Sequence, residues 1–175
     1  MGDGENDVEI EPIDYLIGVL ERGKGKEKFY PFVAHSFEEE GRMWKEFLQW
    51  IAKKDDFILY HWHNYESTHF KKLAMRHGCS PGLWVKIESS LLDLLPIARR
   101  SIMFPTYGYS LKKVAPYCGF KWRQKDVSAT ESIAMYIAYT QTKDSSILDK
   151  ILKYNEDDVI ATRAVKDWMS SIKKK

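Results

Sequence analysis

Residues 153–159 (KYNEDDV) place a phenol and a carboxylate at a spacing that could do chemistry, at what we predict to be the start of the last long helix. On a helix Tyr154 and Asp158 lie four residues apart, so their side chains share one face. A carboxylate there can hold a hard divalent cation, and a phenol beside it can orient a water molecule. The alternative is a solvated acidic first turn that complements the helix dipole. Asp158 is favoured over Asp157, because only Asp158 is four residues from Tyr154.

Three more carboxylates could join this pair. Metal-dependent phosphodiester cleavage uses two divalent ions about 3.5 to 4 Å apart, so several acids must converge from different elements. Asp7 and Glu9 would point to one face of a strand. Glu66 follows an apolar run at 57–62 that we predict to be a central strand buried on both faces. The alternatives are a charged N-terminal tail for Asp7 and Glu9 and a helix-start acid for Glu66.

Histidines and basic residues provide candidate binding groups. His61 and His63 are two residues apart and could bind zinc, but no further ligand lies nearby and a hydrogen-bonded core histidine is the commoner case for His61. We predict that His63, with Asn64, lies on the rim facing a substrate. The candidate phosphate contacts are Arg99, Arg100, Lys112 and Lys113, and the candidate base-stacking rings are Tyr107, Tyr109 and Trp122. For each of these residues the alternative is a solvated face or a core aromatic.

The composition limits the class of protein. The chain has 175 residues, 44% hydrophobic and 14% aromatic, which suits a single domain over residues 1–175 with a sizeable core. The formal charge of +2 comes from 27 basic and 25 acidic residues, so any nucleic-acid surface must be local. The two cysteines form no CxxC pattern, which indicates reduced thiols and a cytoplasmic protein. No apolar run approaches the roughly 20 residues of a membrane span.

The apolar patterns predict strands first and then mainly helices. Residues 1–6 show no pattern and are expected to be an unstructured or expression-derived start. The strands are predicted at 15–21, 29–34 and 57–62, with a short one at 7–11; the helices are predicted at 36–54, 67–77, 128–139 and 147–172, the last interrupted or bent near Tyr154. This order indicates an α/β fold, in which a mixed sheet of an antiparallel meander plus parallel strands is flanked by helices.

Seven short motifs occur in a definite order along the chain. They are Asp7-Val8-Glu9-x-x-Pro12, Tyr15-Leu16-Ile17-Gly18, Tyr60-His61-x-x-x-Tyr65-Glu66, Asp93-Leu94-Leu95-Pro96, Tyr109-Ser110-Leu111-Lys112, Gly119-Phe120-Lys121-Trp122 and Tyr154-Asn155-x-x-Asp158-Val159. This set resembles the RNase H-like, DEDD-type exonuclease superfamily. In particular, it is similar to the predicted ribonuclease H-like domains joined to RecB-like nucleases and helicases.

The resemblance implies a five-stranded RNase H-like sheet, two Mg²⁺ or Mn²⁺ ions, and hydrolysis of single-stranded or frayed DNA or RNA from a 3′ end. It assigns metal binding to Asp7, Glu9, Glu66 and Asp158, and it makes Tyr154 the mark of the tyrosine (DEDDy) subclass. A helicase or RecB-like nuclease module is the implied partner. No membrane is expected as a partner, because no apolar run is long enough to span one.

One departure from the family pattern leaves a second function open. In the family the first acidic motif ends a hydrophobic strand, and residues 1–6 provide no such strand. Either Asp3 and Glu5 take the motif position, or the first strand is degenerate or lies upstream. The alternative function is therefore a catalytically impaired module that binds nucleic acid or a protein partner.

Overall fold

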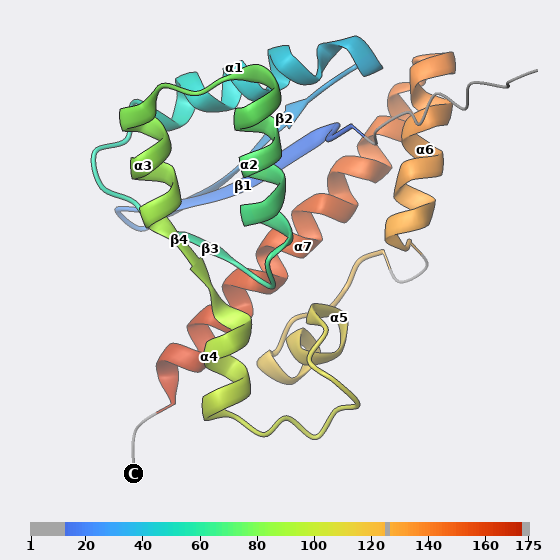
Figure 1. Cartoon of the computed structure of the whole chain (residues 1–175). Helices are drawn as coiled ribbons and strands as arrows, with labels where there is room; N and C mark the ends of the chain where they lie inside the picture. The colour runs from blue at the N-terminus through green and yellow to red at the C-terminus, as the bar shows by residue number, and fades with distance from the viewer. Residues whose placement is uncertain (1–12, 125–126, 173–175) are drawn as a thin grey trace, which may run out of the picture.

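The computed structural model describes residues 13–124 and 127–172. The first acidic motif, with Asp7 and Glu9, lies outside these residues, as do the alternative acids Asp3 and Glu5. Within the described ranges the protein is a mixed α/β structure in which small antiparallel and parallel sheets are flanked by helices (Figure 1). This agrees with the fold class predicted from the sequence.

An antiparallel hairpin forms the first sheet. Strand β1 (Leu16–Gly23) pairs with β2 (Lys26–Val33), and Gly23 faces Lys26 across the turn. The two turn residues, Lys24 and Gly25, both have positive φ, as a two-residue hairpin turn requires. The hairpin confirms the two strands predicted at 15–21 and 29–34, and β2 begins three residues earlier than predicted.

A short parallel pair forms the second sheet. Strand β3 (Leu59–His61) pairs with β4 (Leu91–Asp93), so that His61 lies opposite Asp93. The prediction of a strand over 57–62 that is buried on both faces is wrong. Ile58 and Tyr60 are 57% and 40% exposed, whereas His61 is buried. Within the described residues, one face of β3 is therefore covered and the other is open.

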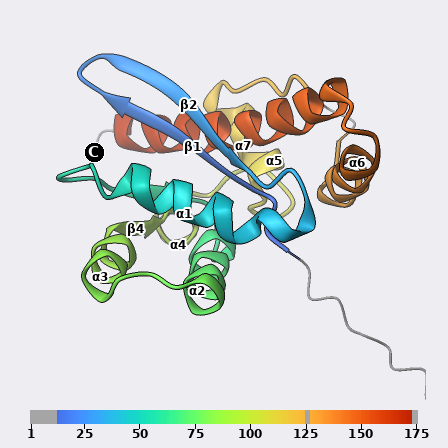
Figure 2. The ribbon, with the colours of Figure 1, turned by 90° about the horizontal axis from the view of Figure 1, so that it is seen from above.

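Helices cover both sides of the hairpin. The first half of the chain contributes η1 (Phe37–Glu39), α1 (Glu40–Ile51), α2 (Tyr65–His77), α3 (Pro81–Ser90) and α4 (Leu94–Ser101). The second half contributes α5 (Leu111–Val114), η2 (Ala115–Cys118), α6 (Ala129–Thr142) and α7 (Ser145–Ser171). Seen from above, the hairpin lies between α1 on one side and α7 on the other (Figure 2). Helix α3 was not predicted, although Ser80 followed by Pro81 is a common way to start a helix.

Helix α7 is continuous from Ser145 to Ser171, so the predicted break near Tyr154 is wrong. Tyr154 lies nine residues into the helix, where first-turn capping and the helix dipole no longer act. The alternative explanation of the Tyr154 and Asp158 pair, a solvated acidic first turn, therefore does not apply.

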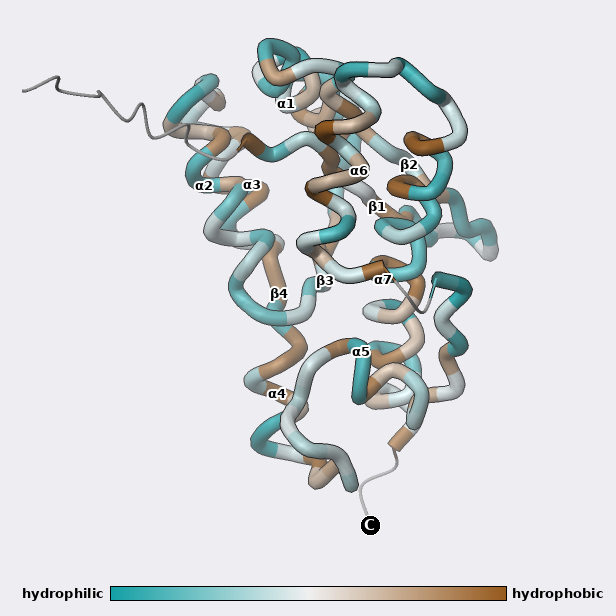
Figure 3. The backbone as a smooth tube through the Cα atoms, turned by 90° about the vertical axis from the view of Figure 1, so that its right-hand side faces the viewer, coloured by the Kyte–Doolittle hydropathy of each residue, from teal (hydrophilic) through white to brown (hydrophobic). Residues whose placement is uncertain are grey.

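Three hydrophobic clusters hold these elements together. One joins the hairpin to α1, α2 and α3; a second joins α4, α5 and η2 to α7; a third joins α6 to the start of α7. Helix α7 contributes Ile151 to the third cluster and Ala161 and Val165 to the second. Hydrophobic and hydrophilic positions alternate along the helices, as expected for helices buried on one face (Figure 3). None of the helices in the described ranges is long and apolar enough to cross a membrane.

Candidate functional site

The candidate site forms where β3 and β4 end and α7 passes beside them. Because the two strands are parallel, their carboxyl ends meet at one edge, and α2 and α4 start there. In open α/β sheets this edge is where ligands bind. Helix α7 contacts both β1 and β3, and Tyr154 and Asp158 lie between the two hydrophobic clusters that α7 joins.

Asp93 links the two strand ends. Its Oδ1 accepts hydrogen bonds from the backbone N–H of His63 at 2.8 Å and of Leu95 at 2.9 Å. The first bond holds the second residue after β3, and the second caps α4. His63 has φ of 73°, a left-handed conformation that is uncommon for a residue other than glycine. Asp93 and the bond between His61 Nδ1 and the His63 carbonyl (2.6 Å) stabilise this bend.

Glu66 lies in the first turn of α2 and points one carboxylate oxygen into the protein. Its Oε2 is buried and has no hydrogen-bond partner among the described residues, and it lies 3.6 Å from His61 Nδ1. Burial, with smaller contributions from the negative charges of Asp158 and Asp93, raises the pKa of Glu66 to about 7. An orphaned carboxylate oxygen of this kind needs either a proton or a cation.

The neighbouring acids Asp157 and Asp158 have different environments. Asp157 is fully buried, and its carboxylate accepts hydrogen bonds from the backbone N–H of Arg123 at 2.9 Å and from Arg123 Nε at 2.5 Å. It therefore anchors the loop after η2. The Asp158 side chain has no such partner in the described ranges; burial raises its pKa to about 6, Lys112 opposes this shift and Asp157 adds to it.

Tyr154 and Lys112 flank Asp158. Burial and the charge of Asp158 raise the pKa of Tyr154 to about 12, so the phenol keeps its proton at neutral pH. Lys112 Nζ lies 5.4 Å from the centre of the Tyr154 ring and donates a hydrogen bond to the Val127 carbonyl at 2.7 Å. A hydrogen-bond donor, a cation and a carboxylate thus lie together on one side of the site.

A glycine in β1 lets α7 approach closely enough to bring Asp158 to this edge. A Cβ atom at Gly18 would lie 1.7 Å from Oδ1 of Asn155 and 2.9 Å from the ring of Phe29. A side chain at this position would displace the Asn155 side chain, the Phe29 ring or the helix itself. The motif residues Gly18 and Asn155 are therefore explained by packing.

The residues present suit a hard divalent cation better than zinc. No group of three or more His, Cys, Asp or Glu side chains that could hold a metal occurs within residues 13–124 and 127–172. The Nδ1 atom of His61 is engaged with the His63 carbonyl, and no third ligand joins the two histidines there, so the zinc hypothesis gains no support. Glu66 and Asp158 provide two carboxylates whose charges interact, which is half of the set that two Mg²⁺ or Mn²⁺ ions would need.

The other predicted residues lie at different distances from this edge. His63 and Asn64 are exposed directly after β3, and Arg99 and Arg100 are exposed in the last turn of α4. Tyr109 is held within the protein: its hydroxyl donates to the Ile102 carbonyl at 2.7 Å, and its carbonyl accepts from Trp62 Nε1 at 2.9 Å.

The sequence interpretation missed a second polar group near the start of α2. Asp14 Oδ1 lies 2.6 Å from His69 Nδ1, and the ring of His69 stacks on the exposed ring of Tyr65 at 3.8 Å. Burial raises the pKa of Asp14, and His69 opposes the shift. The spacing of four residues between Tyr65 and His69 was the available signal, but nothing in the sequence linked either of them to Asp14.

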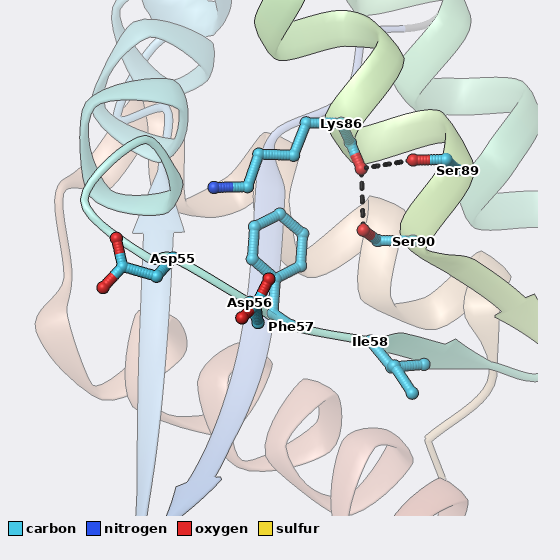
Figure 4. Close-up of a pocket in the computed structure, with 7 residues that line it drawn as sticks. All are labelled: Asp55, Asp56, Phe57, Ile58, Lys86, Ser89 and Ser90. Carbon is cyan, nitrogen blue, oxygen red and sulfur yellow. Dashed lines mark hydrogen bonds between the residues drawn. The ribbon is translucent and has the colours of Figure 1, made fainter.

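A surface pocket of about 430 Å³ lies at the opposite end of β3 (Figure 4). It is lined by Asp55, Asp56, Phe57, Ile58, Lys86, Ser89 and Ser90. The Lys86 amine donates to the Lys54 carbonyl and lies 5.3 Å from the centre of the Phe57 ring. Because this pocket lies before the strands rather than after them, we do not assign the chemistry to it.

Comparison with known proteins gives one family match. A family model described as the RNase H superfamily matches residues 6–170, which includes every carboxylate of the candidate metal set. No curated protein and no solved structure gives a significant match.

Proposed function

The chain belongs to the RNase H superfamily, and we propose that it is a metal-dependent 3′–5′ exonuclease of the DEDDy type that acts on single-stranded or frayed nucleic acid. Family membership supports a hydrolase that acts on nucleic acids. The subtype, the polarity and the two-metal mechanism are our proposal. As an implied partner we further propose a helicase or a RecB-like nuclease module.

One observation carries the proposal: Glu66 presents a buried carboxylate oxygen with no partner in the described ranges, and the charge of Asp158 acts on it. Both acids have raised pKa values, chiefly because they are buried, and a bound cation would stabilise the charged forms of both. Glu66 and Asp158 would hold Mg²⁺ or Mn²⁺ together with Asp7 and Glu9 from the first motif. When bound, the two ions would polarise the phosphoryl group and lower the pKa of the attacking water.

The remaining side chains bind and orient. The Tyr154 hydroxyl, which stays protonated, donates a hydrogen bond that directs the attacking water. Lys112 beside it attracts the phosphate and offsets part of the negative charge around Asp158. His63, fixed by Asp93 in its bent conformation, presents its exposed ring at the rim of the same edge.

The test uses single strands labelled at the 5′ end, incubated with purified protein and Mn²⁺. We expect labelled products that shorten stepwise from the 3′ end, and we expect Asp158→Asn to lower the rate at least roughly a hundredfold, because a metal ligand is lost. Asp149→Asn is the matched control: Asp149 lies exposed on the same helix, and the same chemical change there should leave the rate unchanged.

Three results would contradict the proposal. If wild type and Asp158→Asn cleave equally, the activity comes from a contaminant or from another site. Internal fragments without stepwise shortening would make the protein an endonuclease. Strand binding without Mn²⁺-dependent cleavage would favour the non-catalytic module.

A further inference from the structure

The basic charge of the chain is concentrated in one part of the fold. Residues 94–124, which form α4, the following loop, α5 and η2, contain six basic residues and no acidic one. We call this segment the basic lobe. The whole chain has a formal charge of only +2, so the rest of it is acidic on balance. The lobe lies at the lower end of the molecule in Figures 1 and 3.

Two arginines of this lobe have no acidic partner in the part of the chain that the structure describes. The five arginines that form ion pairs within the described residues are Arg22, Arg42, Arg76, Arg123 and Arg163. Arg99 and Arg100, both exposed in the last turn of α4, form no ion pair or hydrogen bond with any residue in the described ranges. Within the described residues, five of the seven arginines are thus neutralised, and the other two are consecutive in the chain.

The lobe also carries the two most exposed large hydrophobic side chains in the described ranges. Met103 is 94% exposed and Tyr107 is 96% exposed. Their loop is nevertheless anchored: Lys113 Nζ donates to the Tyr107 carbonyl at 2.6 Å, and the Tyr117 hydroxyl donates to the Pro105 carbonyl at 3.1 Å. An exposed aromatic ring on an anchored loop, in the same lobe as two arginines that have no ion pair within the described residues, is an arrangement that can bind unpaired bases.

The lobe is continuous with the carboxylate edge. Helix α4 starts directly after Asp93, whose carboxylate holds His63, and Arg99 and Arg100 lie roughly 10 Å farther along this helix. The loop then returns to α5, where Lys112 lies over the Tyr154 ring. Positive side chains therefore extend from the candidate site to the far end of the lobe.

We propose that the basic lobe binds the single-stranded segment of nucleic acid that leads into the carboxylate edge, with Arg99 and Arg100 on phosphates and the Tyr107 ring stacked on an unpaired base. This rests on the proposed function and adds to it the surface that binds the unpaired strand and the path that the strand follows. The charge of the lobe is complementary to a phosphate backbone, and the exposed ring can stack only on a base that is not paired.

The test measures the fluorescence anisotropy of a labelled single-stranded oligothymidylate in the presence of a chelator, so that cleavage does not interfere. Arg99→Ala/Arg100→Ala should weaken binding about tenfold and reduce the slope of log K against log salt by roughly 1 to 1.5, since each phosphate contact contributes about 0.7. The control, Lys45→Ala/Lys53→Ala, removes two exposed cations in and just after α1, at the other end of the molecule, and should change little.

Tyr107→Ala tests the stacking contact separately. The ring is almost wholly exposed, so the variant should fold as wild type does, which its melting temperature would check. We expect affinity for the single strand to fall by about fivefold or more and affinity for a duplex of the same length to stay unchanged. Equal losses for the single strand and the duplex, or no loss for either, would overturn the single-strand assignment and leave only a general anion surface.

The outcomes separate the lobe from the catalytic proposal. If wild type shows Asp158-dependent cleavage but Arg99→Ala/Arg100→Ala binds as tightly as Lys45→Ala/Lys53→Ala, the lobe assignment is wrong and the exonuclease proposal stands. If the strand binds through Arg99, Arg100 and Tyr107 but Mn²⁺ produces no cleavage, the exonuclease proposal fails and the lobe assignment stands.

Discussion

Replacing Asp158 with Asn should make the metal-free protein more stable at alkaline pH, although it should abolish activity. Burial raises the pKa of Asp158 from 3.8 to about 6, so the charged form is disfavoured in the folded state. A shift of about 2 units corresponds to about 3 kcal/mol at 1.36 kcal/mol per unit. Because solvent still reaches the half-buried side chain, we expect a gain of about 1 to 3 kcal/mol at pH 8.

The stabilising effect of Asp158→Asn on the free energy of unfolding should depend on pH. The pKa of Asp158 in the folded state lies above its value in the unfolded state. The contribution of its carboxyl group to the stability of the wild-type protein is therefore fully present below about pH 4 and is lost as the pH rises through 6. Asn cannot ionise, so the advantage of the variant should be largest at pH 8 and should shrink by more than half at pH 4.5. The assay is urea unfolding at both pH values with a chelator present.

The adjacent residue is the control. Asp157→Asn removes the partner of Arg123 and leaves a buried polar group short of its bonds, so it should lower the free energy of unfolding by about 3 to 5 kcal/mol at pH 8. Two neighbouring Asp→Asn changes should therefore have opposite signs. If Asp158→Asn destabilises the protein at pH 8, or if its effect does not change with pH, the account of a strained apo carboxylate site is refuted.

Three further variants test the elements that build the site. Gly18→Ala should lower the free energy of unfolding in urea by about 1 to 3 kcal/mol, because its Cβ would meet Asn155 Oδ1. Adding Asn155→Ala to the same chain should recover part of this loss. Equal costs of Gly18→Ala with and without Asn155→Ala would contradict the contact. His63→Gly should leave stability within about 1 kcal/mol of wild type, whereas His63→Val should lower it by about 1 to 2 kcal/mol. The reason is that a β-branched residue is strained at φ of 73° and glycine is not. The reverse order of stabilities would show that the bend is not retained. Tyr154→Phe should reduce Mn²⁺-dependent cleavage about tenfold or more and leave binding of the strand in the presence of a chelator unchanged. A loss of binding without a further loss of cleavage rate would show that the phenol contacts the substrate instead.

Local spacing was enough to predict some of this site. Four residues separate Tyr154 from Asp158, and that spacing selected Asp158 over Asp157 before any contact was known. The structure gives the reason why the two acids differ: Asp157 is occupied by Arg123, whose loop lies 34 residues away in the chain. No sequence pattern near Asp157 indicates that partner, so the burial of Asp157 could not be predicted.

Other features depended on packing that short patterns do not encode. The run at 57–62 is apolar throughout and was read as a fully buried strand, yet Ile58 and Tyr60 are exposed. Strand β4 is three residues long and has no alternation from which to predict it. The electrostatic interaction of Glu66 with Asp158 requires α7 to pack against β1 and β3. The close approach of Asn155 to Gly18 that accompanies this packing joins residues more than 100 positions apart.

The central claim is that Glu66 and Asp158 hold a divalent cation, and calorimetric titration with Mn²⁺ at pH 7 tests it most directly. Repeating the titration in buffers of different ionisation enthalpy measures proton release, which we expect because the pKa of Glu66 is about 7 in the metal-free protein. The account predicts that wild type and Asp149→Asn bind Mn²⁺ with release of protons and that Asp158→Asn binds at least about tenfold more weakly. Equal Mn²⁺ affinity in wild type and Asp158→Asn, or no binding by any of the three proteins, would contradict it.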